Sequence, residues 1–262
     1  MIADRIHSWH ATHAGTKRKH NEDTWVDRPD LGIWAVADGA GGHQAGEYAS
    51  GLIAEALDSM PSELSAAELL GEVRVRIAAT HQALREEAER RGGNTMIAST
   101  LVALLARGDH FACLWAGDSR AYMLRDGEMR QITRDHSLVQ ELVDAGTITP
   151  EQAEHHPHAN IITRAVGADI EELVLDKVSG RLQQGDRFLL CSDGVCKTVP
   201  FEQLTELLRS DNGVPPPQSL IAAALALDVT DNVTAVAIEV PMMATADAER
   251  PMDETVATHS SV

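Results

Sequence analysis

Short apolar runs with an acidic residue at one end recur along this chain, and glycine or asparagine lies beside each acid. A carboxylate at the end of a buried strand is held rigidly, and a neighbouring glycine lets a ligand approach the backbone closely. Carboxylates that are gathered at one place repel one another strongly unless a cation lies between them. The pattern therefore favours a fold that brings strand ends together around metal ions. The acids concerned are Asp38, Asp118, Asp193 and Asp231.

The chemistry of these side chains restricts the metal. Mg²⁺ and Mn²⁺ prefer shells of oxygen ligands, and the sequence contains neither a His-Glu-x-x-His motif nor a cysteine quartet. The ligand types therefore indicate Mg²⁺ or Mn²⁺ rather than structural zinc. The competing interpretation is that Asp-Gly is also the strongest hairpin dipeptide. We expect Asp126-Gly127 to be only a turn, and a turn is the commoner role of any one such pair taken singly.

The order of the expected elements indicates a layered α+β domain rather than a regular alternation of strands and helices. Ser65 and Glu68 form the capping box of a long helix that stops at Gly92-Gly93. Apolar runs on both sides of Gly108-Asp109 and of Asp126-Gly127 predict two hairpins. Strands are expected at 6–14, 31–37, 100–106, 111–116, 121–124, 129–132, 173–178, 187–191 and 233–240, and helices at 44–59, 65–91, 137–145, from 149 onward, 201–209 and 218–227.

Charge and composition limit the partners and the compartment. The net charge is −18, from 40 acidic and 22 basic side chains, and such a surface repels nucleic acids and anionic membranes. The N-terminus lacks an apolar signal core, no apolar run approaches the ~18 residues of a membrane span, and three scattered cysteines argue against a disulfide scaffold. These features predict a cytoplasmic protein with reduced thiols. From Pro241 onward the chain loses its periodicity, which predicts a disordered tail over 241–262.

A basic segment followed by acids, Gly15 to Asp23, comes after the first expected strand. It carries Arg18 a few residues before Glu22 and Asp23. The planar guanidinium of arginine matches the oxygens of a phosphate and can grip two of them at once. Taken alone, such a run is more often a solvated loop.

The blocks together resemble the PPM family, the type 2C serine/threonine protein phosphatases, and within it the small bacterial members. They follow one another in the order of the family from Gly15 to Val240. The blocks are GTKRKHNED, VADGAGGHQAGEYAS, AGDSRAYMLRDG, QITRDHS, NIITRAVG, LLCSDGV and DNVTAVAIEV.

The resemblance implies an αββα sandwich of two antiparallel sheets flanked by helices. It also implies that residues 1–240 form the catalytic domain and that about 138–165 form a flap beside the cleft. Two tight Mn²⁺ or Mg²⁺ ions are implied, with a third, weaker ion held by Asp118 together with Asp193. The remaining metal ligands implied are Asp38 bridging both tight ions, Asp193 and Asp231, the carbonyl of Gly39, and Glu22 and Asp23 through water.

The activity that the resemblance implies is hydrolysis of phosphoserine and phosphothreonine in proteins by a water activated between two metals. Asp38 and Arg18 would be the catalytic residues, with Arg18 binding the phosphate. The expected partners are a serine/threonine kinase and its targets, and the expected state is a monomer. The alternative is a catalytically silent module of the same fold. The residue that would act as general acid is not identified, because Ala40 follows the Asp-Gly where some relatives have histidine. We expect structural or surface roles for His43 and His136. We expect the cluster of His155, His156 and His158 to belong to a solvated flap.

Overall fold

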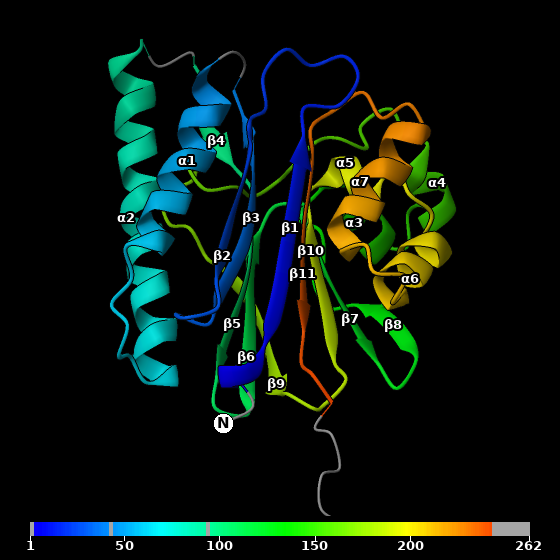
Figure 1. Ribbon diagram of the computed structural model, residues 1–262. Helices are drawn as coiled ribbons and strands as arrows, with labels where there is room; N and C mark the ends of the chain where they lie inside the picture. Colours follow the sequence, from blue (N-terminus) through cyan, green and yellow to red (C-terminus); the bar gives the residue numbers. More distant parts are fainter. Residues whose placement is uncertain (1–2, 42–43, 93–94, 243–262) are drawn as a thin grey trace, which may run out of the picture.

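Two antiparallel sheets, packed face to face, form the centre of the computed structural model, which describes residues 3–41, 44–92 and 95–242 (Figure 1). The first sheet has the order β1 (His7–His13), β11 (Val233–Glu239), β10 (Arg187–Cys191), β7 (Arg120–Arg125) and β8 (Glu128–Gln131). The second has the order β2 (Asp23–Arg28), β3 (Ile33–Ala40), β5 (Leu101–Arg107), β6 (His110–Ala116) and β9 (Asp176–Arg181), with the short β4 (Ala98–Ser99) also paired to β3.

Helices cover both outer faces of this pair of sheets (Figure 1). On the second sheet lie α1 (Gln44–Asp58) and α2 (Ala66–Arg90), and on the first lie α5 (Asp193–Cys196), α6 (Phe201–Arg209) and α7 (Pro216–Ala226). The αββα sandwich expected from the resemblance is therefore confirmed. A short 3-10 helix (Ala3–Arg5) precedes β1.

The alternation of side chains along the central strands explains the layers. On β3, Ile33 and Ala35 face α1 and α2, whereas Trp34 and Val36 point into the layer between the sheets. Because successive residues of a strand point to opposite faces, a strand that is apolar at every position must be covered on both sides. The first sheet repeats this arrangement: along β11, Ala235 faces the α6–α7 side, whereas Val236 and Ile238 face the other sheet.

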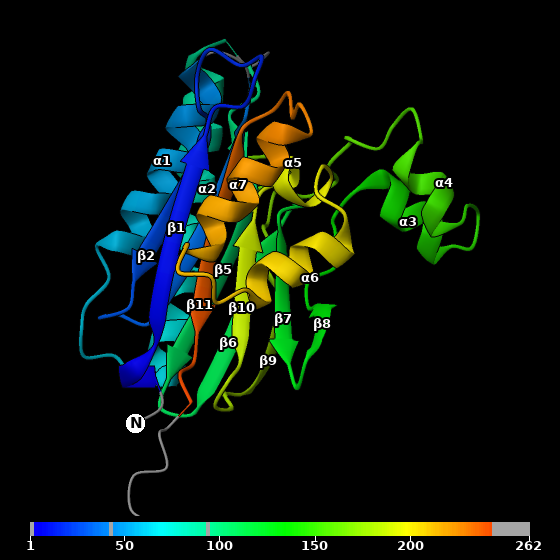
Figure 2. The same ribbon diagram turned by 45° about the vertical axis from the view of Figure 1, so that its right-hand side comes forward.

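The segment 138–165 departs from the sandwich. It contains α3 (Leu138–Asp144) and α4 (Pro150–Glu154), which project to one side of the sheets (Figure 2). Ser137 caps α3 and also forms an isolated bridge with Ile162, so the two ends of the excursion are held together. Its helices agree with the expected ones, and Thr149 forms the cap that the sequence predicted before Pro150.

Most expected elements are confirmed within a residue or two, but two expected strands have different bounds, and the short elements β2, β4 and α5 were not predicted. The expected strand 31–37 continues through Asp38 and Gly39 as far as Ala40. β2 was missed because its sequence is mostly polar, and its pairing with β3 fixes it instead. The helical turn α5 was also missed. The strand expected at 173–178 lies at Asp176–Arg181, since Leu173 and Leu175 pack against the α1–α2 core without pairing to a strand.

The polypeptide beyond Met242 lies outside the described residues, and so does His43, so the predictions for the tail and for that histidine stay predictions. The cysteines at 113, 191 and 196 are free thiols, as expected. None of the helices within residues 3–41, 44–92 and 95–242 is both long and apolar enough to cross a membrane.

Candidate active site

Strand ends from both sheets bring five aspartates to one end of the sandwich. Asp38 lies near the end of β3, directly opposite Asp23 at the start of β2. Asp193 is the first residue of α5 immediately after β10, and Asp231 precedes β11. We call these residues the aspartate cluster: Asp23, Asp38, Asp118, Asp193 and Asp231.

Asp38 is the member of the cluster whose pKa is affected by the charges of all four others. Its pKa is raised well above the usual range, first because its carboxylate loses hydration and then because of the charges of the other four aspartates. Among the described residues, no hydrogen bond or ion pair reaches this carboxylate. Its backbone is fixed, since Asp38 N–H donates to Thr100 Oγ1 at 3.1 Å and Asp38 C=O accepts from Thr100 N–H at 2.8 Å. A carboxylate that has no hydrogen-bond donor and lies near four like charges is stabilised in its ionised form by a bound cation.

Asp23 is buried beside Asp38 and is only half satisfied. Ser192 Oγ donates to its Oδ2 at 2.8 Å, while its buried Oδ1 has no partner. Burial raises the pKa of Asp23 to about 7, Ser192 opposes that shift, and the charges of Asp193 and Asp231 add to it. An unpartnered buried carboxylate oxygen is costly, so this atom is available to a metal-bound water.

Asp118 and Asp193 share one basic side chain. Lys197 Nζ donates to Asp118 Oδ2 at 2.6 Å and to Asp193 Oδ2 at 2.9 Å. Asp118 is 1% exposed, and its other oxygen, Oδ1, has no partner. Burial and the charge of Asp193 raise the pKa of Asp118, and Lys197 works against them. The third metal predicted between these two aspartates thus meets an ammonium group at the same place.

Arg18 lies against Asp231 rather than in open solvent. Its Nε contacts Asp231 Oδ1 and its Nη2 contacts Asp231 Oδ2, both at 2.9 Å, and about half of each side chain remains exposed. The hydrogen bond and charge of Asp231 raise the pKa of Arg18, so the guanidinium is always charged. Arg18 is therefore placed at the rim of the aspartate cluster with part of its surface free for a ligand.

Asn232 holds the loop that carries Arg18 and Glu22. Its Oδ1 accepts from Glu22 N–H at 2.8 Å, and its Nδ2 donates to the carbonyls of Ala14 and His20, both at 3.0 Å. The loop approaches so closely that a Cβ on Gly15, which has φ of +78°, would lie 2.0 Å from the carbonyl oxygen of Asp231. The basic segment is thus anchored at the site, although residues 16–20 remain exposed to solvent.

Gly39 is tightly enclosed by backbone. A Cβ at this position would lie 2.1 Å from Gly46 O of α1 and 2.7 Å from Glu22 O. Gly39 N–H donates to Glu22 O at 3.1 Å, which ties the end of β3 to the residue before β2. Loss of hydration raises the pKa of Glu22, and this effect is larger than the opposing effect of the Arg18 charge. Only glycine at 39 lets α1 reach the site this closely.

The donor set fits divalent ions that prefer oxygen. The cluster offers aspartate carboxylates and a strand carbonyl, with unpartnered buried oxygens on Asp23 and Asp118. Within the described part of the chain, however, no three acidic, histidine or cysteine side chains already surround a common point. Arg18 and Lys197 balance part of the negative charge instead. The residues that metal ions need are therefore present, and their side chains must adjust to close around them.

Comparison with known proteins agrees with this site. The profile of the family described as protein phosphatase 2C matches residues 12–223. The chain belongs to the protein phosphatase 2C family. It is 38% identical over 226 residues to the serine/threonine protein phosphatase PstP of Mycobacterium tuberculosis. The aligned region covers 86% of this chain and 43% of PstP. The chain thus spans less than half the length of PstP.

Two solved structures extend the comparison of this protein phosphatase 2C chain. PppA, described as a key regulatory component of T6SS in Pseudomonas aeruginosa, is 42% identical with a TM-score of 0.82, over 89% of this chain and 97% of that one. The catalytic domain of PstP, solved in complex with two manganese ions, is 34% identical with a TM-score of 0.81, over 90% and 99% of the two chains.

Several positioning residues of this protein phosphatase 2C site were not found from the sequence. Ser192 and Asn232 stand beside predicted ligands, and their burial and bonds to distant segments appear only in the fold. Lys197 gave no signal, because its partner Asp118 lies 79 residues earlier in the chain. His136, expected to be structural, accepts from Gly117 N–H through Nδ1 at 3.1 Å and so steadies the turn before Asp118.

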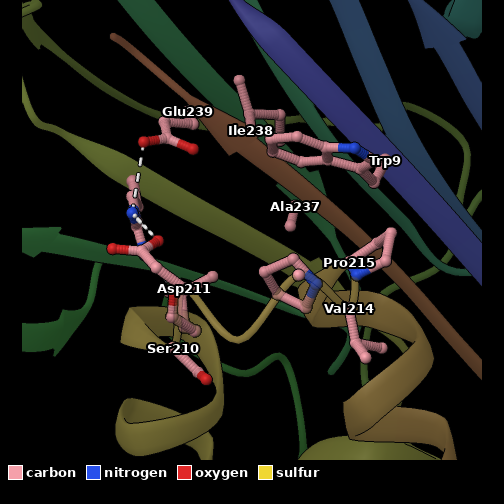
Figure 3. Close-up of a pocket in the computed structure, with 12 residues that line it drawn as sticks. Trp9, Ser210, Asp211, Val214, Pro215, Ala237, Ile238 and Glu239 are labelled. Atoms are coloured by element: carbon pink, nitrogen blue, oxygen red, sulfur yellow. Dashed lines mark hydrogen bonds and ion pairs between the residues drawn. The ribbon is translucent and has the colours of Figure 1, made fainter. Parts of the chain in front are cut away.

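A pocket of about 290 Å³ lies elsewhere, between β1, β11 and the segment that joins α6 to α7 (Figure 3). Trp9 and Pro215 line its apolar side. Arg187 and Glu239, which line the other side, contact each other at 3.2 Å. Arg187 begins β10 and Glu239 ends β11, so the pocket lies toward the opposite end of these strands from the aspartate cluster. It is not part of the candidate active site.

Proposed function

We propose that this chain hydrolyses phosphoserine and phosphothreonine in proteins with the help of two divalent metal ions, Mn²⁺ or Mg²⁺. The observation that carries the proposal is the convergence of four distant aspartates on Asp38, whose carboxylate has no hydrogen-bond donor among the described residues. The two manganese ions of the related PstP catalytic domain support the same conclusion.

Each ligand has a proposed task. Asp38 would bridge both ions, Asp193 and Asp231 would complete one shell, and the Gly39 carbonyl would serve the other. Glu22 and Asp23 would hold water molecules at the edge of the site, a task that suits the unpartnered Oδ1 of Asp23. Bound ions of this kind supply hydroxide near neutral pH and a positive field for the phosphoryl oxygens.

Arg18 would bind the substrate phosphate. Its guanidinium stays charged, keeps about half of its surface exposed and is held at the rim of the cluster by a loop that Asn232 fixes. A phosphate oxygen would take up the free face of the fork while Asp231 orients the other. The leaving alkoxide needs a proton, and no side chain is assigned to that step; His136 is committed to Gly117 and Asp176.

The wider setting is also proposed rather than shown. Residues 1–240 would form the catalytic domain, and the projecting segment 138–165 would act as a flap that influences which phosphoproteins bind. The kinase that phosphorylates those substrates is the proposed partner, and the chain would act as a monomer in the cytoplasm. The net charge of −18 supports the absence of nucleic acid among the partners. No observation favours a catalytically silent module, since every predicted ligand is present.

The test is hydrolysis of a phosphothreonine peptide and of p-nitrophenyl phosphate with Mn²⁺, before and after chelation. The wild-type chain should release phosphate from both, and Asp38→Asn should release almost none. Asp126→Asn is the matched control, because Asp126 lies in an exposed turn with φ of +52°, a conformation that asparagine also tolerates. A wild-type chain inactive on both substrates in saturating Mn²⁺ would overturn the proposal.

A further inference from the structure

Lys197 occupies a defined position at the edge of the aspartate cluster. It follows α5, and its backbone N–H donates to Asp193 O at 2.8 Å, which fixes the start of its side chain. Its ammonium then reaches three acceptors: Asp118 Oδ2 at 2.6 Å, Asp193 Oδ2 at 2.9 Å and Asn160 Oδ1 at 3.4 Å. An ammonium has three donors, so every one of them has an acceptor within reach.

The contact with Lys197 compensates the negative charge of the buried Asp118 carboxylate. Asp118 is 1% exposed, and a carboxylate so deeply buried needs a paired cation. Lys197 supplies that cation, since its ammonium donates to Asp118 Oδ2 at 2.6 Å and to Asp193 Oδ2 at 2.9 Å. Asp118 therefore already has its counter-charge without any metal.

We propose that Lys197 is a built-in cation that takes the place of a third metal ion between Asp118 and Asp193. The inference rests on the proposed function and limits it: this chain binds two divalent ions, and the third one expected from the resemblance is replaced by an ammonium group. Steric and electrostatic reasons favour the ammonium over a metal ion at this carboxylate. A Mg²⁺ ion lies only ~2.1 Å from its ligand oxygens, and the same Asp118 oxygen is already in contact with Lys197 Nζ.

The unpartnered Oδ1 of Asp118 is the remaining opening for a metal. An ion there would share one buried carboxylate with the ammonium, and the two positive charges would repel each other. Asn160 adds a second consequence, because it belongs to the projecting segment 138–165 and contacts the same Nζ. Lys197 thus links this segment to the aspartates by a permanent charge, whereas a weakly bound ion would make the link depend on metal concentration.

The experiment counts bound Mn²⁺ by isothermal titration calorimetry and by electron paramagnetic resonance of free Mn²⁺. The wild-type chain and Asp118→Asn should both bind two ions. Lys197→Met and Lys197→Asp should bind a third, weaker ion, and that ion should be lost again when Asp118→Asn is added. Lys177→Met, at an exposed position of β9, is the control and should keep two ions.

A third Mn²⁺ in the wild-type chain that disappears in Asp118→Asn would overturn the inference, and so would a count of two in both Lys197 variants. The wild-type comparison does not depend on whether a Lys197 variant folds. Ion counting also separates this inference from the proposed activity: absence of hydrolysis with two bound ions would refute the function, whereas hydrolysis with three bound ions would refute only the role of Lys197.

Discussion

Asp23 gives the metal-free protein a pH dependence that the structure lets us calculate. Its folded-state pKa is about 7, chiefly because it is buried, whereas an aspartate in an unfolded chain has a pKa of about 3.9. Between these two pKa values the folded chain holds one proton more than the unfolded chain, so the free energy of unfolding falls as pH rises. The contribution is fully present below the unfolded pKa and is lost by the time pH has passed the folded pKa.

The magnitude follows from the difference in pKa. About 3 units correspond to roughly 4 kcal/mol, of which about 2 kcal/mol should be lost between pH 5 and pH 7. Urea unfolding of the protein in chelator across this range measures the loss. Asp23→Asn should remove the slope that Asp23 contributes, even if the new amide changes the absolute stability, and Asp126→Asn should leave the slope unchanged. An Asp23→Asn protein with the wild-type slope would refute the reasoning.

Three further predictions concern the site and its supports. Arg18→Ala should weaken inhibition by inorganic phosphate without lowering the number of bound Mn²⁺ ions, since Arg18 pairs with Asp231 but is no ligand; loss of metal by calorimetry would count against its role. Asn232→Ala should reduce the free energy of unfolding by about 2–4 kcal/mol, because three hydrogen bonds to loop 14–22 are lost; an unchanged urea midpoint would contradict this. Gly39→Ala should lower the melting temperature and the activity, because its Cβ would clash with Gly46 O. Gly71→Ala in α2, where the space is open, is the control and should not destabilise the protein. Equal melting temperatures for the two variants would contradict this prediction.

Elements with a strong local signal were predictable from the sequence. β10 and α6 begin and end at the predicted residues, and the box formed by Ser65 and Glu68 caps α2 as expected. Apolar runs, capping residues and Asp-Gly turns act over a few residues, so one sequence is enough to identify them. β2 could not be found in this way. It is an edge strand with a polar sequence, and pairing to β3 determines it rather than its own composition.

The site was predictable to a similar depth. The acids at strand ends were recognised one by one, but their convergence on Asp38 came from the resemblance, because nothing in a local pattern says which strand ends meet. The fold brings all of them together. It also adds two features that have no local signature: the burial of Asp23, and the ammonium of Lys197 between Asp118 and Asp193. Both depend on contacts between distant segments, which residue spacing does not encode.

The central claim is that Asp38, Asp193 and Asp231, which come from distant segments, would hold a pair of divalent ions together with the carbonyl of Gly39. Anomalous diffraction from crystals of the protein grown with Mn²⁺ tests it most directly. The account predicts two strong peaks roughly 3.5–4 Å apart, as in other two-metal sites, with the carboxylate of Asp38 between them. Crystals with no peak among these side chains, or with peaks that Asp38 does not touch, would contradict it.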